Sequence, residues 1–166
     1  MTTVETLNVK REPLNAKVKI VNNRDARTAK GKQSPMRTFE DLDVWKICRE
    51  LRRQIAELAR TFPQEEKYRL THQLIRAARS VTANLAEGYG RFHYAENIQF
   101  ARQARGPLYE VLDHLTVARD ERFLSHQQFE ATRDEVLKAT MLLNGFIRYL
   151  SKAKAAVHDS RLTINE

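Results

Sequence analysis

The chain has few of the residues that build disulfide-rich or turn-rich folds. Its 166 residues include one cysteine, five glycines and four prolines. A single cysteine, Cys48, excludes an internal disulfide, and no apolar run of signal-peptide length precedes the first expected helix, so we expect a cytoplasmic protein. No uninterrupted apolar run approaches the ~20 residues that span a bilayer. We therefore expect a soluble protein with no membrane partner.

Catalytic and metal-binding motifs are also missing. The sequence contains no HExxH, no phosphate-binding glycine loop and no GxSxG. Helical di-iron proteins use Glu-x-x-His pairs, and none of the five histidines follows a glutamate at that spacing. Glu110 and His114 are one helical turn apart, which favours a structural hydrogen bond over a metal site. We predict no metal, no cofactor and no catalytic residue.

Acidic residues are fewer than basic ones. The chain holds 29 Lys and Arg against 21 Asp and Glu, a net charge of +8. This balance indicates a polyanionic partner, with RNA or DNA as the first candidate and ordinary solubilising charge as the alternative. Residues 1–36 hold eight of the basic and three of the acidic residues and show no sustained helical period. We expect them to form a flexible basic arm.

The sequence is rich in helical periodicity, most clearly from Thr71 to Gly90. At ~100° per residue, one apolar line contains Leu70, Leu74, Ala78, Val81 and Leu85. A neighbouring line, the polar stripe, can admit a close helix neighbour and hydrogen-bond to it. The polar members of this stripe are Gln73, Ser80, Asn84 and Glu87.

The end of this helix carries two further expectations. Gly88 is the type of residue found just beyond a helix end, so the helix should stop there. Glu87 lies in the last turn, where the helix dipole disfavours an anion. We therefore expect Glu87 to have a cationic partner, such as an arginine from a neighbouring helix. No nucleophile and base lie together in this stretch, so a structural role for the polar stripe is favoured.

A helix before this stretch should begin near Asp41, whose carboxylate can cap its first amides, and end before Pro63. Cys48 lies in its apolar seam and is expected to be a buried small hydrophobe. Its opposite face carries a cluster of basic residues, with Glu50 and Glu57 to one side. We call this cluster the first basic face; its members are Lys46, Arg49, Arg52, Arg53 and Arg60. Its role is either nucleic-acid binding or that of a solvated surface with local ion pairs.

Two more helices are expected after Gly90. The third should extend from Tyr94 to Arg122 with a kink at Pro107, because proline removes one amide and clashes with the preceding turn. The fourth should begin at a capping box formed by Ser125 and Gln128. Its apolar surface is wider than one seam, which indicates a second contact with the third helix or with another subunit.

These elements predict an all-α fold, an antiparallel up-down-up-down four-helix bundle. We assign residues 1–36 to the basic arm, residues 37–155 to the bundle and residues 156–166 to a frayed C-terminal tail.

Three strings carry a family resemblance. FPQEEKYRLTHQLIRAARSVTANLAEGYGR closely resembles the four-helix-bundle proteins encoded in ribosomal-RNA intervening sequences, a family akin to the Avd accessory proteins of diversity-generating retroelements. FEDLDVWK and ARGPLYEVLDHL resemble further landmarks of that family, and together they cover residues 37–153. The resemblance implies a ring-shaped homopentamer. In retroelements it implies an accessory protein that joins a reverse transcriptase and template RNA.

We therefore expect a non-catalytic, oligomeric scaffold that binds nucleic acid. Two alternatives remain open. One is a structural adaptor that binds only proteins. The other is a ribonuclease of the helical HEPN type, for which Arg119 and His126 have a comparable spacing, although His126 falls in the turn before the fourth helix.

Overall fold

A computed structural model describes residues 37–91 and 93–162. Side chains are described up to Val157. The predicted basic arm, residues 1–36, lies outside the described residues. Within them the structure is all-helical and has no strand. The elements in chain order are the 3-10 turn η1 (Phe39–Asp41), α1 (Asp43–Ala59), the 3-10 turn η2 (Gln64–Glu66), α2 (Leu70–Gly90), α3 (Tyr94–Asp120) and α4 (His126–Leu162).

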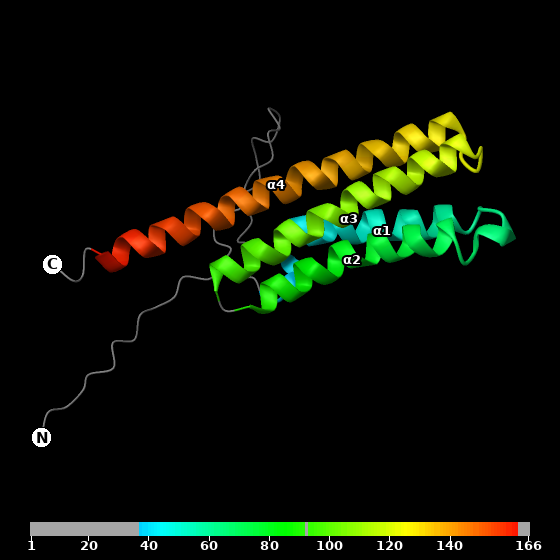
Figure 1. The fold of residues 1–166 in the computed structure, drawn as a ribbon. Helices are drawn as coiled ribbons and strands as arrows, with labels where there is room; N and C mark the ends of the chain where they lie inside the picture. The colour runs from blue at the N-terminus through cyan, green and yellow to red at the C-terminus, as the bar shows by residue number, and fades with distance from the viewer. Residues whose placement is uncertain (1–36, 92, 163–166) are drawn as a thin grey trace, which may run out of the picture.

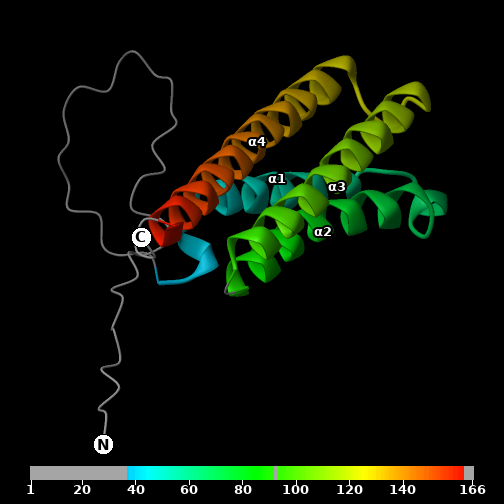
Figure 2. The same cartoon turned by 60° about the vertical axis from the view of Figure 1, so that its left-hand side comes forward.

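The four long helices form an antiparallel bundle, as predicted (Figure 1). Each helix packs against the one that follows it, and α1 also packs against α4, which closes the bundle. The α1–α2 pair and the α3–α4 pair therefore lie on opposite sides, and Figure 2 shows that they cross at an angle. The C-terminal part of α4 extends beyond the other helices (Figure 1).

The core is made by one apolar seam from each helix. Ile55, Leu74, Leu108 and Leu143 are completely buried, and burying such a side chain contributes about 1.5–3 kcal/mol. Cys48 also lies in this core, as the sequence predicts, and burial raises the pKa of its thiol to about 12. Cys48 is therefore a protonated hydrophobic side chain at neutral pH.

The start of α1 differs from the prediction. Asp41 ends the η1 turn, and its Oδ2 accepts hydrogen bonds from the backbone amides of Arg37 at 2.8 Å and Thr38 at 3.2 Å. These bonds lower the pKa of Asp41. Its carboxylate is thus committed to the turn before the helix, and α1 begins at Asp43 with no side-chain cap.

The role predicted for Gly88 is wrong. Helix α2 continues to Gly90, and Gly88 is buried within it. A Cβ atom at position 88 would lie 2.9 Å from Phe100 Cβ and 3.0 Å from Asn97 Oδ1, both on α3. A glycine is needed at this position because α3 approaches closely, and it does not end the helix.

Helix α3 continues through Pro107 without a break and ends at Asp120, two residues before the predicted end. Ala104, Leu108 and Val111 are fully buried on both sides of the proline, so packing holds the helix together where one backbone hydrogen bond is lost. Arg122 follows in a left-handed conformation with φ of 62°, which reverses the chain towards α4.

The predicted capping box at the start of α4 is confirmed. The Ser125 amide donates to Gln128 Oε1 at 3.0 Å, and the Gln128 amide donates to Ser125 Oγ at 3.2 Å. Two otherwise unpaired amides are satisfied in this way. The helix then continues to Leu162, so residues 156–162 are helical where the sequence predicts a frayed tail.

Candidate functional site

The first basic face is largely neutralised by neighbouring carboxylates. Three of its five cations bind an acidic residue three positions earlier on α1. The pairs are Lys46 with Asp43 at 3.4 Å, Arg53 with Glu50 at 3.2 Å and Arg60 with Glu57 at 2.6 Å. All six side chains are exposed, so each pair adds little stability. The pairs nevertheless lower the positive charge that this face offers to an external anion.

Arg49 and Arg52 are the two members of the first basic face that form no salt bridge in the described part of the chain. The guanidinium of Arg49 lies 5.9 Å from the ring centre of Trp45, which is buried beneath it. Arg52 Nη1 donates to Thr82 Oγ1 on α2 at 2.9 Å. This bond directs Arg52 to the junction of α1 and α2.

Helix α2 adds a cation to this junction. The hydroxyl of Thr82 accepts from Arg52 and donates to the backbone carbonyl of Arg79 at 3.1 Å. The Arg79 side chain is exposed and forms no salt bridge within the described residues. Together, Arg49, Arg52 and Arg79 make what we call the α1–α2 basic surface. The sequence analysis missed Arg79, although the lack of any acidic residue from 67 to 86 is a signal for it.

The hydrogen bonds described for the polar stripe lie within α2 itself. Asn84 Nδ2 donates to the Ser80 carbonyl at 2.9 Å and to Ser80 Oγ at 3.3 Å. Among the described residues, no hydrogen bond from a neighbouring helix reaches Gln73, Ser80 or Asn84. Gln73 is exposed to solvent. A structural role for the stripe stays a prediction.

Glu87 has the predicted cationic partner, an arginine, but this arginine does not come from a neighbouring helix. Its Oε1 lies 2.5 Å from Arg91 Nη2, and Arg91 is the residue directly after α2. A cation just past the C-terminus of the helix offsets the unfavourable position of Glu87. Both side chains are about half exposed. The pair therefore closes the end of α2 at the surface and does not join two helices.

Arg119 and His126, the residues of the ribonuclease alternative, are not paired among the described contacts. Arg119 Nη2 lies 2.8 Å from Asp120 Oδ1, and its guanidinium lies 4.6 Å from the ring centre of Phe129. His126 is the exposed first residue of α4. Arg119 is thus held between a carboxylate and an aromatic ring, and no hydrogen bond joins it to His126 among the described contacts.

Glu110 and His114 also differ from the prediction. Their Oε1 and Nε2 atoms are 3.7 Å apart, which is too long for a hydrogen bond. His114 Nε2 is buried without a hydrogen-bond partner among the described atoms. Within residues 37–91 and 93–162 no group of three or more His, Cys, Asp or Glu side chains is placed to hold a metal ion.

The architecture defines a four-helix-bundle protein with an apolar core and an ionic surface. The chain belongs to the 23S rRNA-intervening sequence protein family, whose sequence model matches residues 40–145.

A solved structure has the same fold. It is a protein of unknown function from the S23 ribosomal protein family of Bacteroides thetaiotaomicron, with 21% identity and a TM-score of 0.59 over 63% of this chain and 97% of that chain. At this identity the likeness shows the fold alone. No curated protein matches the sequence. None of the described helices is long and apolar enough to cross a membrane.

Proposed function

We propose that the protein is a non-catalytic, oligomeric scaffold that binds RNA or DNA through phosphate contacts. The observation that carries this proposal is the α1–α2 basic surface. There, Arg52 contacts Thr82, Arg49 lies one turn before Arg52 on α1, and Arg79 lies one turn before Thr82 on α2; none of the three arginines has a carboxylate partner among the described residues. Arginine without a carboxylate partner is well suited to phosphate, because its planar donors bind phosphate oxygens in pairs.

The described residues of this surface include no exposed aromatic side chain on which a base could stack. Trp45 is the aromatic residue next to these arginines, and it is buried beneath Arg49. It is therefore not exposed for stacking on a base. Phosphate contacts and counterion release should dominate, so binding should be indifferent to sequence and should weaken steeply as salt rises.

Self-association is the second part of the proposal, and it rests on exposed apolar side chains. Ile147 is buried within the chain and Leu142 packs partly against its core, so the excess apolar surface of α4 is narrower than the sequence indicates. Leu137 and Met141 remain 38% and 64% exposed. We propose that a second copy of the chain covers them. A ring of five, which the family resemblance implies, would repeat the α1–α2 basic surface and strengthen weak contacts through multivalency.

The experiment measures anisotropy of labelled mixed-sequence RNA and DNA with wild type and two charge-matched variants. Arg49→Glu with Arg79→Glu removes two unpaired cations, so affinity should fall at least about tenfold. Lys46→Glu with Arg53→Glu makes the same change in net charge at cations that already have partners. This control should bind much more nearly as wild type does. Equal losses of affinity in both variants would show that binding depends on net charge and not on the α1–α2 basic surface.

Two results would favour the other readings. If wild type does not bind at low salt and purifies free of nucleic acid, the protein is an adaptor for other proteins. If labelled RNA is cleaved and His126→Ala abolishes that cleavage, the protein is a ribonuclease. Because the sequence resembles a family akin to the Avd accessory proteins, we also propose a reverse transcriptase as partner. Co-purification of such an enzyme with the wild-type protein, dependent on template RNA, would test that part separately.

A further inference from the structure

A second group of unpaired cations lies on the other side of the bundle, on α3 and α4. The sequence has no acidic residue from 97 to 109 or from 136 to 158. The first of these stretches lies in α3 and the second in α4. Their exposed cations at this end of the bundle, which we call the α3–α4 basic surface, are Arg102, Arg105, Arg148 and Lys152. None of the four forms a salt bridge within the described part of the chain.

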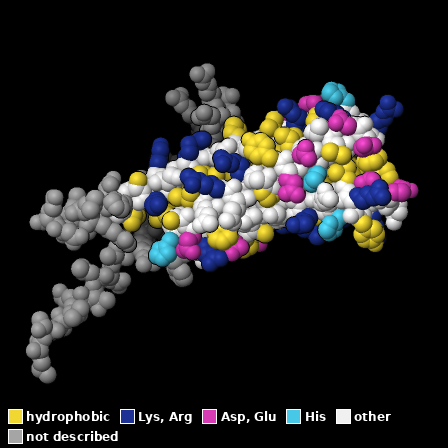
Figure 3. Space-filling view, viewed as in Figure 1, with side chains coloured by type: hydrophobic (Ala, Val, Ile, Leu, Met, Phe, Trp, Pro, Cys, Tyr) yellow, Lys and Arg dark blue, Asp and Glu magenta, His cyan; other side chains and the backbone are white. Residues whose placement is uncertain are grey.

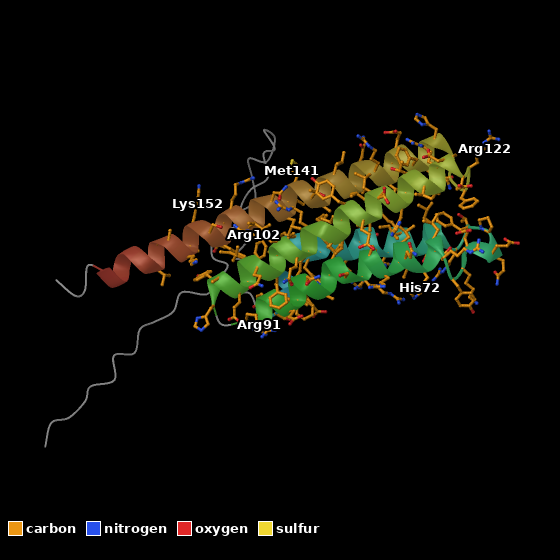
Figure 4. The ribbon with its side chains drawn as sticks, in the orientation of Figure 1. His72, Arg91, Arg102, Arg122, Met141 and Lys152 are labelled. Carbon is orange, nitrogen blue, oxygen red and sulfur yellow. The ribbon has the colours of Figure 1, made fainter. Side chains whose placement is uncertain are left out.

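One hydrogen bond sets the register between the two helices. Arg105 Nη1 donates to Asn144 Oδ1 at 3.4 Å. Arg102 is about one turn before Arg105 on α3, and Arg148 is about one turn after Asn144 on α4. Because the two helices are antiparallel, Arg102 therefore lies across from Arg148. Figure 4 shows Arg102 on α3 and Lys152 on α4, near the end of the bundle where α4 extends outward.

Within the described part of the chain, basic side chains predominate over this area (Figure 3). Figure 3 shows dark-blue side chains over the C-terminal part of α4 and the N-terminal part of α3, with magenta ones nearer the other end and along the lower edge. This arrangement differs from that of the first basic face, where three of the five cations are paired with carboxylates. Among the described residues, no carboxylate offsets the positive charge of these four cations.

The spacing of the four cations fits a chain of phosphates better than one small anion. Successive cations on one helix are about one turn, ~5 Å, apart, and packed helix axes are about 8–10 Å apart. One phosphate is too small to reach all four. Beside them lies an open depression of about 480 Å³, lined by Ala95, Ile98, Gln99, Arg102 and Gln103. Its glutamine amides can donate hydrogen bonds to phosphate or sugar oxygens.

We propose that the α3–α4 basic surface is a second binding site for the phosphate backbone of nucleic acid. This inference rests on the proposed function and assigns it a site that the sequence analysis did not predict. Cations beside glutamine amides suit the phosphate and sugar oxygens of a nucleic-acid strand. Because the α1–α2 and α3–α4 pairs lie on opposite sides of the bundle, one protein molecule then holds two segments of nucleic acid.

The test compares four variants of the full chain by anisotropy of labelled mixed-sequence RNA across a salt series. The first is Arg102→Glu with Arg148→Glu, and the second is Arg49→Glu with Arg79→Glu. The third combines all four changes. The fourth, Arg69→Glu with Arg133→Glu, is a charge-matched control at exposed cations that already have carboxylate partners. Circular dichroism and light scattering verify fold and mass, and Arg102→Gln with Arg148→Gln replaces the first variant if it misfolds.

We expect the first variant to lose about tenfold or more in affinity. The slope of log affinity against log salt should fall by about 1.4, corresponding to two lost single-strand phosphate contacts. The third variant should lose more than either of the first two, and the control should bind nearly as wild type does.

Three results would overturn the inference while leaving the proposed function intact. In the first result, Arg102→Glu with Arg148→Glu binds RNA as wild type does, whereas Arg49→Glu with Arg79→Glu loses affinity. The next is an equal loss in the control, which would show an effect of net charge alone. The last is a first variant that keeps RNA binding but no longer sediments with vesicles of phosphatidylcholine and phosphatidylserine, which would assign the surface to membranes. Wild type that binds no RNA at low salt would overturn the proposed function as well.

Discussion

Gly88 of α2 and Asn97 of α3 are in such close contact that a Cβ atom on residue 88 would lie 3.0 Å from Asn97 Oδ1. The same Cβ would lie 2.9 Å from Phe100 Cβ. Asn97 is itself buried, with 2% of its surface exposed, so it has little room to move away. The α2–α3 contact therefore depends on the absence of a side chain at position 88.

This relationship predicts the effect of one added methyl group. Gly88→Ala should lower the free energy of unfolding by about 1–3 kcal/mol, because overpacking forces neighbouring groups apart. Gly90→Ala is the matched control, since nothing lies within 4 Å of a Cβ at that position. Urea denaturation of both variants checks the prediction. Equal stability of the two would show that α3 does not approach α2 as closely as described.

A second prediction concerns Glu87, which the sequence analysis treats as part of an inward polar stripe. Because Glu87 and Arg91 are about half exposed, Glu87→Ala should change the free energy of unfolding by less than about 1 kcal/mol. Thermal unfolding at low and high salt gives the measurement, and the small effect should shrink further with salt. A large, salt-independent loss would place Glu87 in a buried interface with another subunit.

The third prediction is a dependence of stability on pH at Cys48. Burial raises the pKa of the folded thiol to about 12 from an ordinary 9.0. In the unfolded chain the thiol loses its proton first, so the unfolded state binds fewer protons above pH 9. The stabilisation from keeping a protonated thiol is thus fully present below about pH 9 and is lost as pH rises towards 12.

Urea unfolding of wild type and Cys48→Ala at pH 8 and at pH 10 isolates this effect. The variant should be less stable at pH 8, because a buried side chain is shortened, and should lose less stability on going to pH 10. A thiol reagent should react with native wild type only slowly. Rapid labelling without unfolding would contradict the burial of Cys48.

The fourth prediction concerns self-association through α4. Met141 is 64% exposed and apolar, so Met141→Glu should place a charge in the proposed contact between copies and lower the mass measured by light scattering. Gln127→Glu is a control that adds the same charge at an exposed position near the start of α4. Wild type with the mass of a monomer at micromolar concentration would contradict the proposed assembly, and an unchanged mass in Met141→Glu would place the contact elsewhere.

Much of the fold follows from the sequence because it depends on local and periodic signals. The apolar line through Leu74 and Leu85 fixes which face of α2 is buried, and both residues are almost completely buried in the structure. The capping box of Ser125 and Gln128 places the start of α4, since its two hydrogen bonds join residues only three positions apart. Signals of this range do not depend on how helices are arranged in space.

Other features depend on which helices meet, and the sequence signals for them were misleading. Gly88 has the local signature of a helix end, yet the approach of α3 is what requires a glycine there. Asp41 is a good cap in sequence, but its carboxylate is taken by the amides of Arg37 and Thr38. In both cases a tertiary or turn contact outweighs a local preference.

The candidate binding surfaces show the same division. Net charge and the clustering of basic residues on α1 are visible in the sequence, and so is the absence of acids between residues 136 and 158. Which cations meet across helices was decided by the tertiary structure. Arg53 pairs with Glu50 only three positions away on α1, as the sequence allows. Arg52 is turned towards Thr82 on α2, and Arg102 lies across from Arg148, because of how the helices pack. Hydrogen bonds and ion pairs between helices need their atoms within about 4 Å of each other. They therefore depend on distances that helix packing sets and the linear sequence does not contain.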